Sequence, residues 1–332
     1  MKIGYLGAGA WGFTLAYLLA QKGYSVKLWS ANHKLIETLK SGKKHPKLPS
    51  CEPAKTLEFT TDLAYAIEDV DLVIESVTSK GIRPVLSQIK QLGKDLPNFV
   101  ITSKGIEQKS LLLLSEVAID VLGDSFKDKV GCLSGPSLAN EVMNKLPSSV
   151  VCAAYNHDLM MLIAEAFSNN FFRVYPNSDV PGVSFGGAMK NVIAIACAIS
   201  DGLGFGQNTK SALMTRGLHE IRKLSASKGA NPETLNGLGG LGDLIATCLS
   251  PLSRNYEFGR LLSMGLTPQQ AQEKVGMVVE GAYSCVSALE LSKKMGIDVP
   301  ITKVVYKIIY EGLDMKEAVE SLLSRKIKKE HL

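Results

Sequence analysis

A glycine-rich turn close to the N-terminus, Gly7-Ala8-Gly9-Ala10-Trp11-Gly12, constrains the fold of this chain more than any other feature of its sequence. The turn follows the apolar run Ile3–Leu6 and leads into a helical pattern over Thr14–Gln21. In such a G-x-G-x-x-G turn the first glycine permits a tight bend, the second lets a pyrophosphate approach the backbone, and the third lets helix and strand pack closely. The first turn of the helix then offers free N–H groups to the phosphates. The sequence therefore predicts a βαβ unit that binds a dinucleotide.

The same stretch superficially resembles a signal peptide, because Ile3–Gln21 carries no charge and follows Lys2. Glycines interrupt it, however, which favours a strand, a turn and a helix over one continuous apolar helix. No other stretch reaches the ~18 uninterrupted apolar residues of a membrane span. We therefore expect no integral membrane segment and a cytoplasmic location.

Short apolar runs alternate with helical patterns through the first half of the chain, which is typical of βαβ units and a parallel sheet. After Pro176–Gly182 the pattern becomes helical, and we expect a helix to begin near Ser184 and to carry the apolar run Val192–Ile199. The prediction is an α/β fold, with an N-terminal Rossmann-like doubly wound sheet over residues 1–180 and a C-terminal all-α domain over residues 181–332. Ser41–Lys55 contains three prolines and is interpreted as an irregular excursion. The expected strands are Ile3–Leu6, Ser25–Trp29, Leu57–Thr60, Leu72–Val77, Phe99–Thr102, Val130–Leu133, Ser149–Ala153 and Phe172–Tyr175.

The charge of the chain limits its partners. Lys and Arg number 37 and Asp and Glu number 32, so the formal net charge is +5, with no dominant block of like charge. A nucleic-acid binder usually shows a basic patch with interleaved aromatic residues, and a membrane-surface protein shows a basic amphipathic helix. Because neither pattern stands out, we expect no nucleic-acid partner and consider a small anionic ligand.

The cysteines and histidines do not form a metal-binding pattern. The six cysteines are scattered without a Cys-x-x-Cys pair, and the five histidines show neither His-Glu-x-x-His nor a cysteine at ligand spacing. Several cysteines lie in apolar runs, such as Cys152 after Val150 and Val151, which favours buried reduced thiols. We predict no structural metal.

The residues that follow the expected second strand bear on the choice between NAD and NADP. A site specific for NAD normally has Asp or Glu there, about 20 residues after the glycine turn, to hold the ribose hydroxyls. This chain has Trp29-Ser30-Ala31-Asn32, with neither an acidic residue nor an arginine. His33 and Lys34 are near, and Ser30 or Asn32 can hydrogen-bond a 2′-phosphate. The preference stays open, with a slight lean to NADP.

Polar residues also follow two of the expected central strands. Thr102-Ser103-Lys104-Gly105 and Ser134-Gly135-Pro136-Ser137 lie at the sheet edge where open α/β folds bind ligands. In the alternative interpretation Lys104 is an ordinary surface lysine and Ser137 is a helix N-cap. Position alone does not decide between these interpretations.

Two more polar segments lie in the helical half. Lys190 and Asn191 open an apolar helix, where a lysine either reaches solvent or is buried with a lowered pKa, and we favour a functional role. Asp243 and Thr247 lie four residues apart on one helix face, so their side chains can converge on one ligand. The alternatives are an N-cap for Asp243 and a solvent-facing position for Arg254. Four such segments beside a dinucleotide fold favour a functional site.

Together these residues resemble the NAD(P)-dependent glycerol-3-phosphate dehydrogenase family of bacterial type. The segment from Gly187 to Asn208 is the most specific match, and the glycine turn is the least specific. The resemblance implies reduction of dihydroxyacetone phosphate to sn-glycerol 3-phosphate by NAD(P)H, for glycerophospholipid synthesis. It also implies a substrate-binding helical domain and a homodimer formed through that domain. The matching segments, in the family's order, are Gly7–Gly12, Ser103–Glu107, Ser134–Ser137, Gly187–Ala194, Gly204–Asn208, Gly240–Leu244, Ser253–Asn255 and Val278–Gly281.

The resemblance implies roles for individual residues as well. Lys190 is expected to be the catalytic acid/base that protonates the carbonyl oxygen, and Lys104 to lie near both nicotinamide and substrate. Positive charge near the developing alkoxide stabilises it. The implied substrate contacts are Lys104, Gly135, Ser137, Lys190, Asp243, Ser253, Arg254 and Asn255. The implied cofactor contacts are Gly7, Gly9, Ala10, Trp11, Gly12, Lys104, Ala139, Arg254, Val278 and Glu280.

Some positions depart from the pattern of the glycerol-3-phosphate dehydrogenase family. Ala31 stands where the family often has Arg or His, while Ala10 and Ser137 replace the commoner Ser and Thr.

The β-hydroxyacid and 6-phosphogluconate dehydrogenases are similar in several features, but they have Asn four residues after the lysine, where this chain has Ala194. A non-catalytic dinucleotide sensor is disfavoured because it does not need a lysine, an aspartate and an arginine at these positions together.

Overall fold

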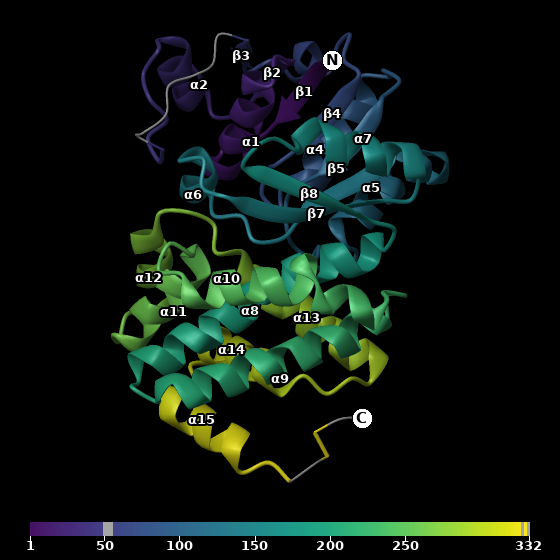
Figure 1. The fold of residues 1–332 in the computed structure, drawn as a ribbon. Helices are drawn as coiled ribbons and strands as arrows, with labels where there is room; N and C mark the ends of the chain where they lie inside the picture. The colour runs from purple at the N-terminus through teal and green to yellow at the C-terminus, as the bar shows by residue number, and fades with distance from the viewer. Residues whose placement is uncertain (49–55, 327–328, 331–332) are drawn as a thin grey trace.

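The computed structural model describes residues 1–48, 56–326 and 329–330, and it places a sheet-containing half above a helical half (Figure 1). Eight strands form one sheet in the order β3-β2-β1-β4-β5-β6-β7-β8. All eight lie where the sequence predicts strands, which confirms the Rossmann-like α/β fold. The strands are β1 Lys2–Leu6, β2 Ser25–Trp29, β3 Leu57–Thr60, β4 Leu72–Glu75, β5 Asn98–Ile101, β6 Val130–Ser134, β7 Ser148–Ala154 and β8 Phe172–Asn177.

The sheet is parallel except between β6 and β7, which pair antiparallel, with Cys132 opposite Ala153. The expectation of a parallel sheet is therefore wrong at this one pair. Residues 135–147 lead from the carboxyl end of β6 directly into β7, so the chain runs back along its neighbour. A parallel pair would need a crossover to the other end of the sheet.

Helices cover both faces of the sheet because alternate strand residues point to opposite faces. Leu72 and Ile74 of β4 pack in the core beneath α1 and α7, and Val73 packs in the core beneath α4 and α5. This layering is the doubly wound arrangement. The helices of this half are α1 Ala10–Gln21, α2 His33–Lys40, α3 Leu63–Ala66, α4 Ile82–Gln91, α5 Leu114–Leu122, α6 Ala139–Met143 and α7 His157–Phe167. Of the predicted excursion Ser41–Lys55, residues 41–48 contain no helix or strand, and residues 49–55 lie outside the described residues.

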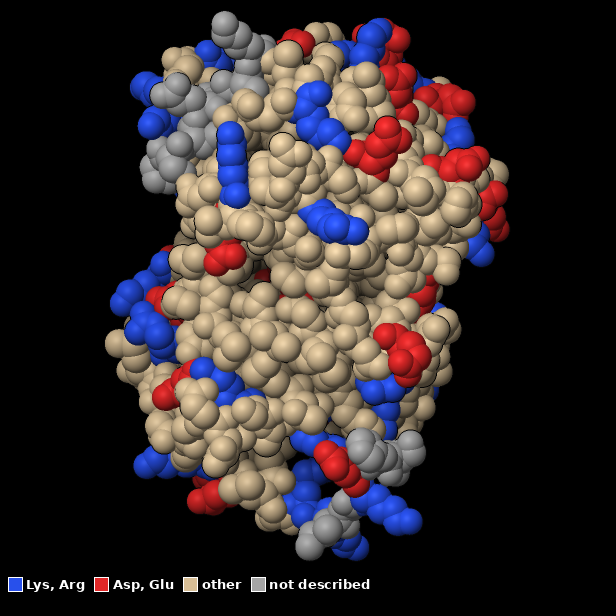
Figure 2. Space-filling view, viewed as in Figure 1, with Lys and Arg blue, Asp and Glu red and all other residues tan. Residues whose placement is uncertain are grey.

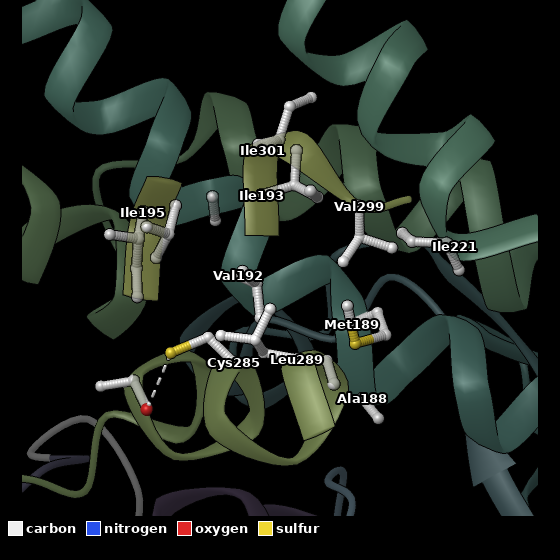
Figure 3. Close-up of a cluster of buried hydrophobic side chains, with 14 of the residues drawn as sticks. Ala188, Met189, Val192, Ile193, Ile195, Ile221, Cys285, Leu289, Val299 and Ile301 are labelled. Carbon is white, nitrogen blue, oxygen red and sulfur yellow. Dashed lines mark hydrogen bonds between the residues drawn. The ribbon is translucent and has the colours of Figure 1, made fainter. Parts of the chain in front are cut away.

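The helical half is organised around α8, which spans Val180–Gly202. Val192, Ile193 and Ile195 of α8 pack against α9, α13 and α14 (Figure 3). In the described residues α8 is the one helix long and apolar enough to cross a membrane, but 89% of its apolar window is buried inside the protein. The remaining helices are α9 Gly206–Ala226, α10 Asp243–Leu249, α11 Arg254–Ser263, α12 Pro268–Val275, α13 Glu280–Met295, α14 Pro300–Tyr306 and α15 Met315–Leu323.

The start of α8 differs from the sequence prediction by about one turn. The helix begins at Val180, four residues before the predicted Ser184. Asp179 caps it by accepting a hydrogen bond from the Gly182 N–H at 2.9 Å, and Pro181 occupies the first turn. Both residues are common at helix starts, because an aspartate satisfies a free N–H and a proline there loses no hydrogen bond.

The described cysteines match the predicted thiols, and Cys51 lies outside the described residues. Cys132, Cys152, Cys197, Cys248 and Cys285 are buried and free. Within the described part of the chain, no group of three or more His, Cys, Asp or Glu side chains is placed to hold a metal ion.

Candidate active site

The glycine turn has the geometry that its sequence predicts. Gly7 has φ +112°, which favours glycine, and a Cβ added to Gly12 would lie 2.0 Å from the Gly7 carbonyl oxygen. A Cβ added to Gly9 would meet nothing within 4 Å. The turn is thus closed toward the sheet and open at Gly9, beside the free N–H groups that begin α1. This open cradle fits the pyrophosphate of a dinucleotide.

A cleft of about 520 Å³ extends from this turn and is lined by both halves of the protein. The Trp11 indole N–H lies buried with no hydrogen-bond partner among the described residues, so it is a donor for a bound group. Most of the predicted site residues line the cleft, whereas Gly7, Gly135 and Asp243 lie behind its surface. The predicted residues at its surface are Gly9, Ala10, Trp11, Gly12, Lys104, Ser137, Ala139, Lys190, Ser253, Arg254, Asn255, Val278 and Glu280.

Two lysines share one buried carboxylate within this cleft. Lys190 donates to Asp243 Oδ1, and Lys104 Nζ donates to Asp243 Oδ2 at 2.7 Å. The Asp243 side chain is 1% exposed, and the side chains of Lys190 and Lys104 are 10% and 14% exposed. Three charged groups at such low exposure are held by each other, because an unpaired buried charge is costly. The interpretation of Lys104 as an ordinary surface lysine is wrong.

The environment of Lys190 shifts its proton affinity. Burial lowers the pKa of Lys190 from its ordinary value to about 7; the Asp243 carboxylate opposes that shift and the nearby Lys104 charge adds to it. An ammonium with a pKa near neutrality can both give up and take back a proton under cellular conditions. Lys190 therefore has the properties of a general acid/base.

Close packing of glycines brings Asp243 to Lys190. A Cβ added to Gly186 on α8 would lie 2.2 Å from the Gly239 carbonyl oxygen, so only glycine permits this approach. The segment Leu238–Gly242 is a π-helical turn that leads into α10, whose first residue is Asp243. The N-cap of α10 is Gly242, so Asp243 is not an N-cap. The glycine-rich segment near residue 240 therefore sets the distance between the two charged residues.

Lys104 also connects the sheet to the loop after β6. Its Nζ donates to the Ser137 hydroxyl and to the Gly135 carbonyl, each at 3.1 Å. The Ser137 hydroxyl donates to the Gly135 carbonyl at 2.8 Å, and the N-cap of α6 is Leu138. Ser137 is therefore part of the lysine's surroundings and does not cap the helix.

The start of α11 brings three further predicted residues to the cleft. The Ser253 hydroxyl caps α11 by accepting from the Tyr256 N–H at 3.3 Å. Asn255 donates to the Asn191 side chain at 2.9 Å and accepts from the Gly281 N–H at 2.8 Å, so it ties α11 to α8 and α13. Arg254 lines the cleft, where burial lowers its pKa and Glu280 opposes that effect. Arg254 is an exposed residue at the surface of the cleft, so it is open to solvent, as the alternative prediction states, and it lines the cleft as well.

Thr247 makes a local contact. Its hydroxyl donates to the Asp243 carbonyl oxygen at 2.7 Å, one turn earlier in the same helix. Thr247 still lines the cleft, but its hydroxyl hydrogen is used by the backbone, as is common for threonine inside a helix. The contact between Thr247 and Asp243 therefore runs from side chain to backbone, and the convergence of their two side chains on one ligand stays a prediction.

The sequence did not single out two acidic contacts near the cofactor end of the cleft. Ser79, four residues after β4, donates to the Glu280 carboxylate through its hydroxyl. Glu75, the last residue of β4, is fully buried; burial raises the pKa of its carboxyl to about 8, and Ser103 donates to it at 2.7 Å. Ser79 and Glu75 both lie at the carboxyl end of a parallel strand, and this position is the sequence signal that could have identified them. In the sequence Glu75 reads as part of an apolar run, which hides it.

Charge elsewhere on the molecule is mixed. On the face shown in Figure 2, basic and acidic side chains are interspersed over both halves, and the central area is largely uncharged. This face therefore presents no single-sign surface. Lys104 and Lys190 differ from these surface charges because their side chains are buried in the cleft.

Comparison with known proteins gives the family. Residues 2–160 match a family described as the N-terminus of NAD-dependent glycerol-3-phosphate dehydrogenase, and residues 179–320 match its C-terminus. The chain is 55% identical over 330 residues to a glycerol-3-phosphate dehydrogenase [NAD(P)+] of Chlamydia pneumoniae, covering 99% of both chains. It is 54% identical over 333 residues to the protein of that name in Protochlamydia amoebophila, covering 100% of this chain and 99% of the relative.

Solved structures agree. The structure of glycerol-3-phosphate dehydrogenase from Coxiella burnetii superimposes with a TM-score of 0.93 at 38% identity, covering 98% of this chain and 99% of that one. A D-mandelate dehydrogenase solved with NADH shares the fold, with a TM-score of 0.63 at 17% identity and coverage of 98% and 100%. The resemblance drawn from the sequence motifs is confirmed: this chain belongs to the NAD-dependent glycerol-3-phosphate dehydrogenase family.

Proposed function

We propose that this chain reduces dihydroxyacetone phosphate to sn-glycerol 3-phosphate with NAD(P)H, and that Lys190 is its acid/base. The observation that carries the proposal is the buried Lys190–Asp243–Lys104 cluster, in the cleft that begins at the glycine turn. Relatives that are 55% and 54% identical, matched over nearly their whole length, carry the corresponding name. The product is the glycerol phosphate unit on which glycerophospholipids are built.

When bound at the glycine turn, NAD(P)H would supply the hydride for the carbonyl carbon of the substrate. The electron pair of the carbonyl bond moves to oxygen, and that oxygen takes a proton from the Lys190 ammonium. Lys104 places a second positive charge beside the developing alkoxide, in a site where burial strengthens the interaction. Asp243 orients both lysines and keeps the pKa of Lys190 from falling further. Lys190 then recovers a proton from solvent.

The substrate phosphate is assigned to the start of α11. Arg254 provides a guanidinium suited to a dianionic phosphate, and the first turn of a ten-residue helix adds free N–H groups. Ser253 and Asn255 flank the arginine, and Ser137 completes the substrate contacts from the sheet side. The Gly135 carbonyl, behind the cleft surface, accepts the Ser137 hydroxyl. The phosphate end of the substrate would then lie at Arg254, with the carbonyl of its central carbon nearest Lys190.

The cofactor is assigned to the glycine turn, with Trp11, Ala139, Val278 and Glu280 along its path. At the end of β2 the Ser30 hydroxyl accepts from the Asn32 N–H at 3.2 Å, and Asn32 caps α2 by accepting from Leu35. No acidic side chain follows β2 to repel a 2′-phosphate, so we propose that both NADH and NADPH are used. A homodimer through the helical half and a cytoplasmic location accompany the proposal as predictions.

The direct test follows the near-ultraviolet absorbance of NADH or NADPH while dihydroxyacetone phosphate is added. We expect oxidation of the cofactor with dihydroxyacetone phosphate and much slower oxidation with unphosphorylated dihydroxyacetone, which lacks the anchor for Arg254. A dinucleotide sensor would bind the cofactor without oxidising it. A β-hydroxyacid dehydrogenase would instead reduce NAD(P)+ in the presence of a 3-hydroxy acid. Either result would contradict the proposal.

A further inference from the structure

A second cavity, of about 530 Å³, lies between α15 and the helices α8, α9 and α14. In Figure 1, α15 lies at the end of the helical half farthest from the sheet. Among the described residues the cavity shares no lining residue with the active-site cleft. Its volume falls within the range of about 300–1,000 Å³ that small-molecule sites occupy.

The inner walls of this cavity are apolar. Ile199 of α8 and Ile301 and Val305 of α14 are buried beneath it. Met315 and Val319, on the inward face of α15, line it from the other side. Ala318 is the only described residue of α15 that is buried, and Met315 packs against the same core, whereas Val319, Leu322 and Leu323 border the cavity without being buried. A hydrocarbon chain in this space would cover apolar surface on both sides.

Basic residues gather in the solvent-accessible part of the lining. Arg216 and Lys223 come from α9, and Arg325 and Lys326 follow α15. Within the described residues Lys223 and Lys326 form no ion pair, whereas Arg325 pairs with Asp298. Free ammonium groups beside an apolar cavity provide a position for an anionic head group.

The buried acidic residue of the lining does not cancel this charge. The Glu220 carboxylate accepts hydrogen bonds from the Ile301 and Thr302 N–H groups at 2.6 and 3.1 Å, and from the Thr302 hydroxyl at 2.9 Å. It therefore caps the start of α14 and is turned to the backbone. Lysine and arginine residues of the lining outnumber its acidic residues, five to three.

We propose that this cavity binds a single-chain anionic amphiphile of the fatty-acid class, with the chain beneath α15 and the head group beside Lys223 and Lys326. A small inorganic anion would leave the apolar walls uncovered, and a neutral apolar molecule would make no use of the cations. One acyl chain with one anionic head group uses both features. The site is separate from the proposed dehydrogenase reaction and does not depend on it.

The test uses the full-length protein and a fluorescent probe, 11-(dansylamino)undecanoic acid, below its micellar concentration. We expect saturable fluorescence enhancement that unlabelled dodecanoate displaces and that dodecanol, which has the chain without the charge, displaces at least tenfold less well. Val319→Trp fills the cavity from α15 and should weaken probe binding at least tenfold. Ala212→Trp, at the exposed edge of the same cavity, should act in the same direction.

Charge and fold controls make the result specific. Lys223→Glu combined with Lys326→Glu should weaken binding by roughly tenfold, because two attractions become repulsions. Lys303→Glu, an exposed lysine of α14 outside the cavity lining, should leave binding unchanged. The dehydrogenase kcat of Val319→Trp should equal that of the wild type, which shows that the variant is folded.

Three results would overturn the proposal. One is the absence of saturable binding to the wild type. Another is equal binding by the wild type and both tryptophan variants. The third combines two measurements: the wild type sediments as a dimer that the Val319→Trp substitution dissociates, and the wild type does not bind dodecanoate. In that case a second copy of the chain covers the cavity.

Discussion

At the scale of single residues, the proposed reaction depends on one lysine with a shifted pKa. Lys190→Met should lower kcat by about 10²–10⁴-fold, because that is the contribution of proton transfer by a positioned group. The variant should fold, since Asp243 keeps Lys104 as a partner. Cofactor affinity, measured by NADH fluorescence titration, should stay within about twofold of the wild type. Lys303→Met serves as the matched surface control, and a variant that loses both turnover and its folded circular dichroism spectrum would make Lys190 structural.

The pH dependence follows from the same residue. With a pKa of about 7, Lys190 carries its proton below that pH and loses it above. Reduction needs the protonated form, so kcat for dihydroxyacetone phosphate should fall as pH rises through about 7. Oxidation of glycerol 3-phosphate needs the neutral form, so its kcat should rise through the same pH.

A variant tests the cause of that pH dependence. Asp243→Asn removes the charge that raises the pKa of Lys190, so the fall in the reduction rate should move to lower pH. Profiles of kcat against pH for both proteins, in both directions, make this comparison. An unchanged midpoint in Asp243→Asn would show that the carboxylate does not act on this lysine.

At the scale of elements, substitutions at two glycines of the turn between β1 and α1 should affect folding and cofactor binding separately. Gly12→Ala places a Cβ against the Gly7 backbone, so it should lower the free energy of unfolding by about 1–3 kcal/mol and lower Tm. Gly9→Ala meets no protein atom but enters the space assigned to the pyrophosphate. It should raise the KM for NAD(P)H by roughly tenfold, a loss of about 1.4 kcal/mol, with little change in Tm. Thermal melting and steady-state kinetics distinguish the two variants, and a Gly9→Ala enzyme with normal KM would place the pyrophosphate elsewhere.

At the scale of the whole molecule, the proposed active site lies where the two halves meet. Lys104 follows β5 of the sheet, while Asp243 begins α10 of the helical half. Lys104→Met and Asp243→Asn should each lower kcat/KM by about 10²-fold or more, and the double variant should lose far less than the product of the two, because contacting residues are not independent. A double-mutant cycle on kcat/KM measures this coupling. Strictly multiplicative losses would mean that the two side chains act separately.

Local patterns in the sequence were sufficient for the strands and the glycine turn, and they favoured a functional role for Lys190, whereas position alone did not decide the role of Lys104. Period-two apolar runs and glycines before a helix are properties of neighbouring residues, so they are visible without the fold. The sequence pattern likewise singled out Lys190 as a charge in an apolar helix. The direction of β7 was not predictable in this way, because it depends on where the short connection after β6 can reach.

The tertiary structure alone decided which charges meet. Lys104, Lys190 and Asp243 are separated by 86, 53 and 139 positions in their three pairings, and nothing in the local sequence pairs them. They come together because glycines let α8 and the segment before α10 approach within backbone contact, and because the carboxyl end of β5 faces that junction. Burial then sets the pKa of Lys190, and burial is a property of packing. Local sequence thus determined the elements and the reactive groups, whereas packing between distant elements determined their proton affinity and their partners.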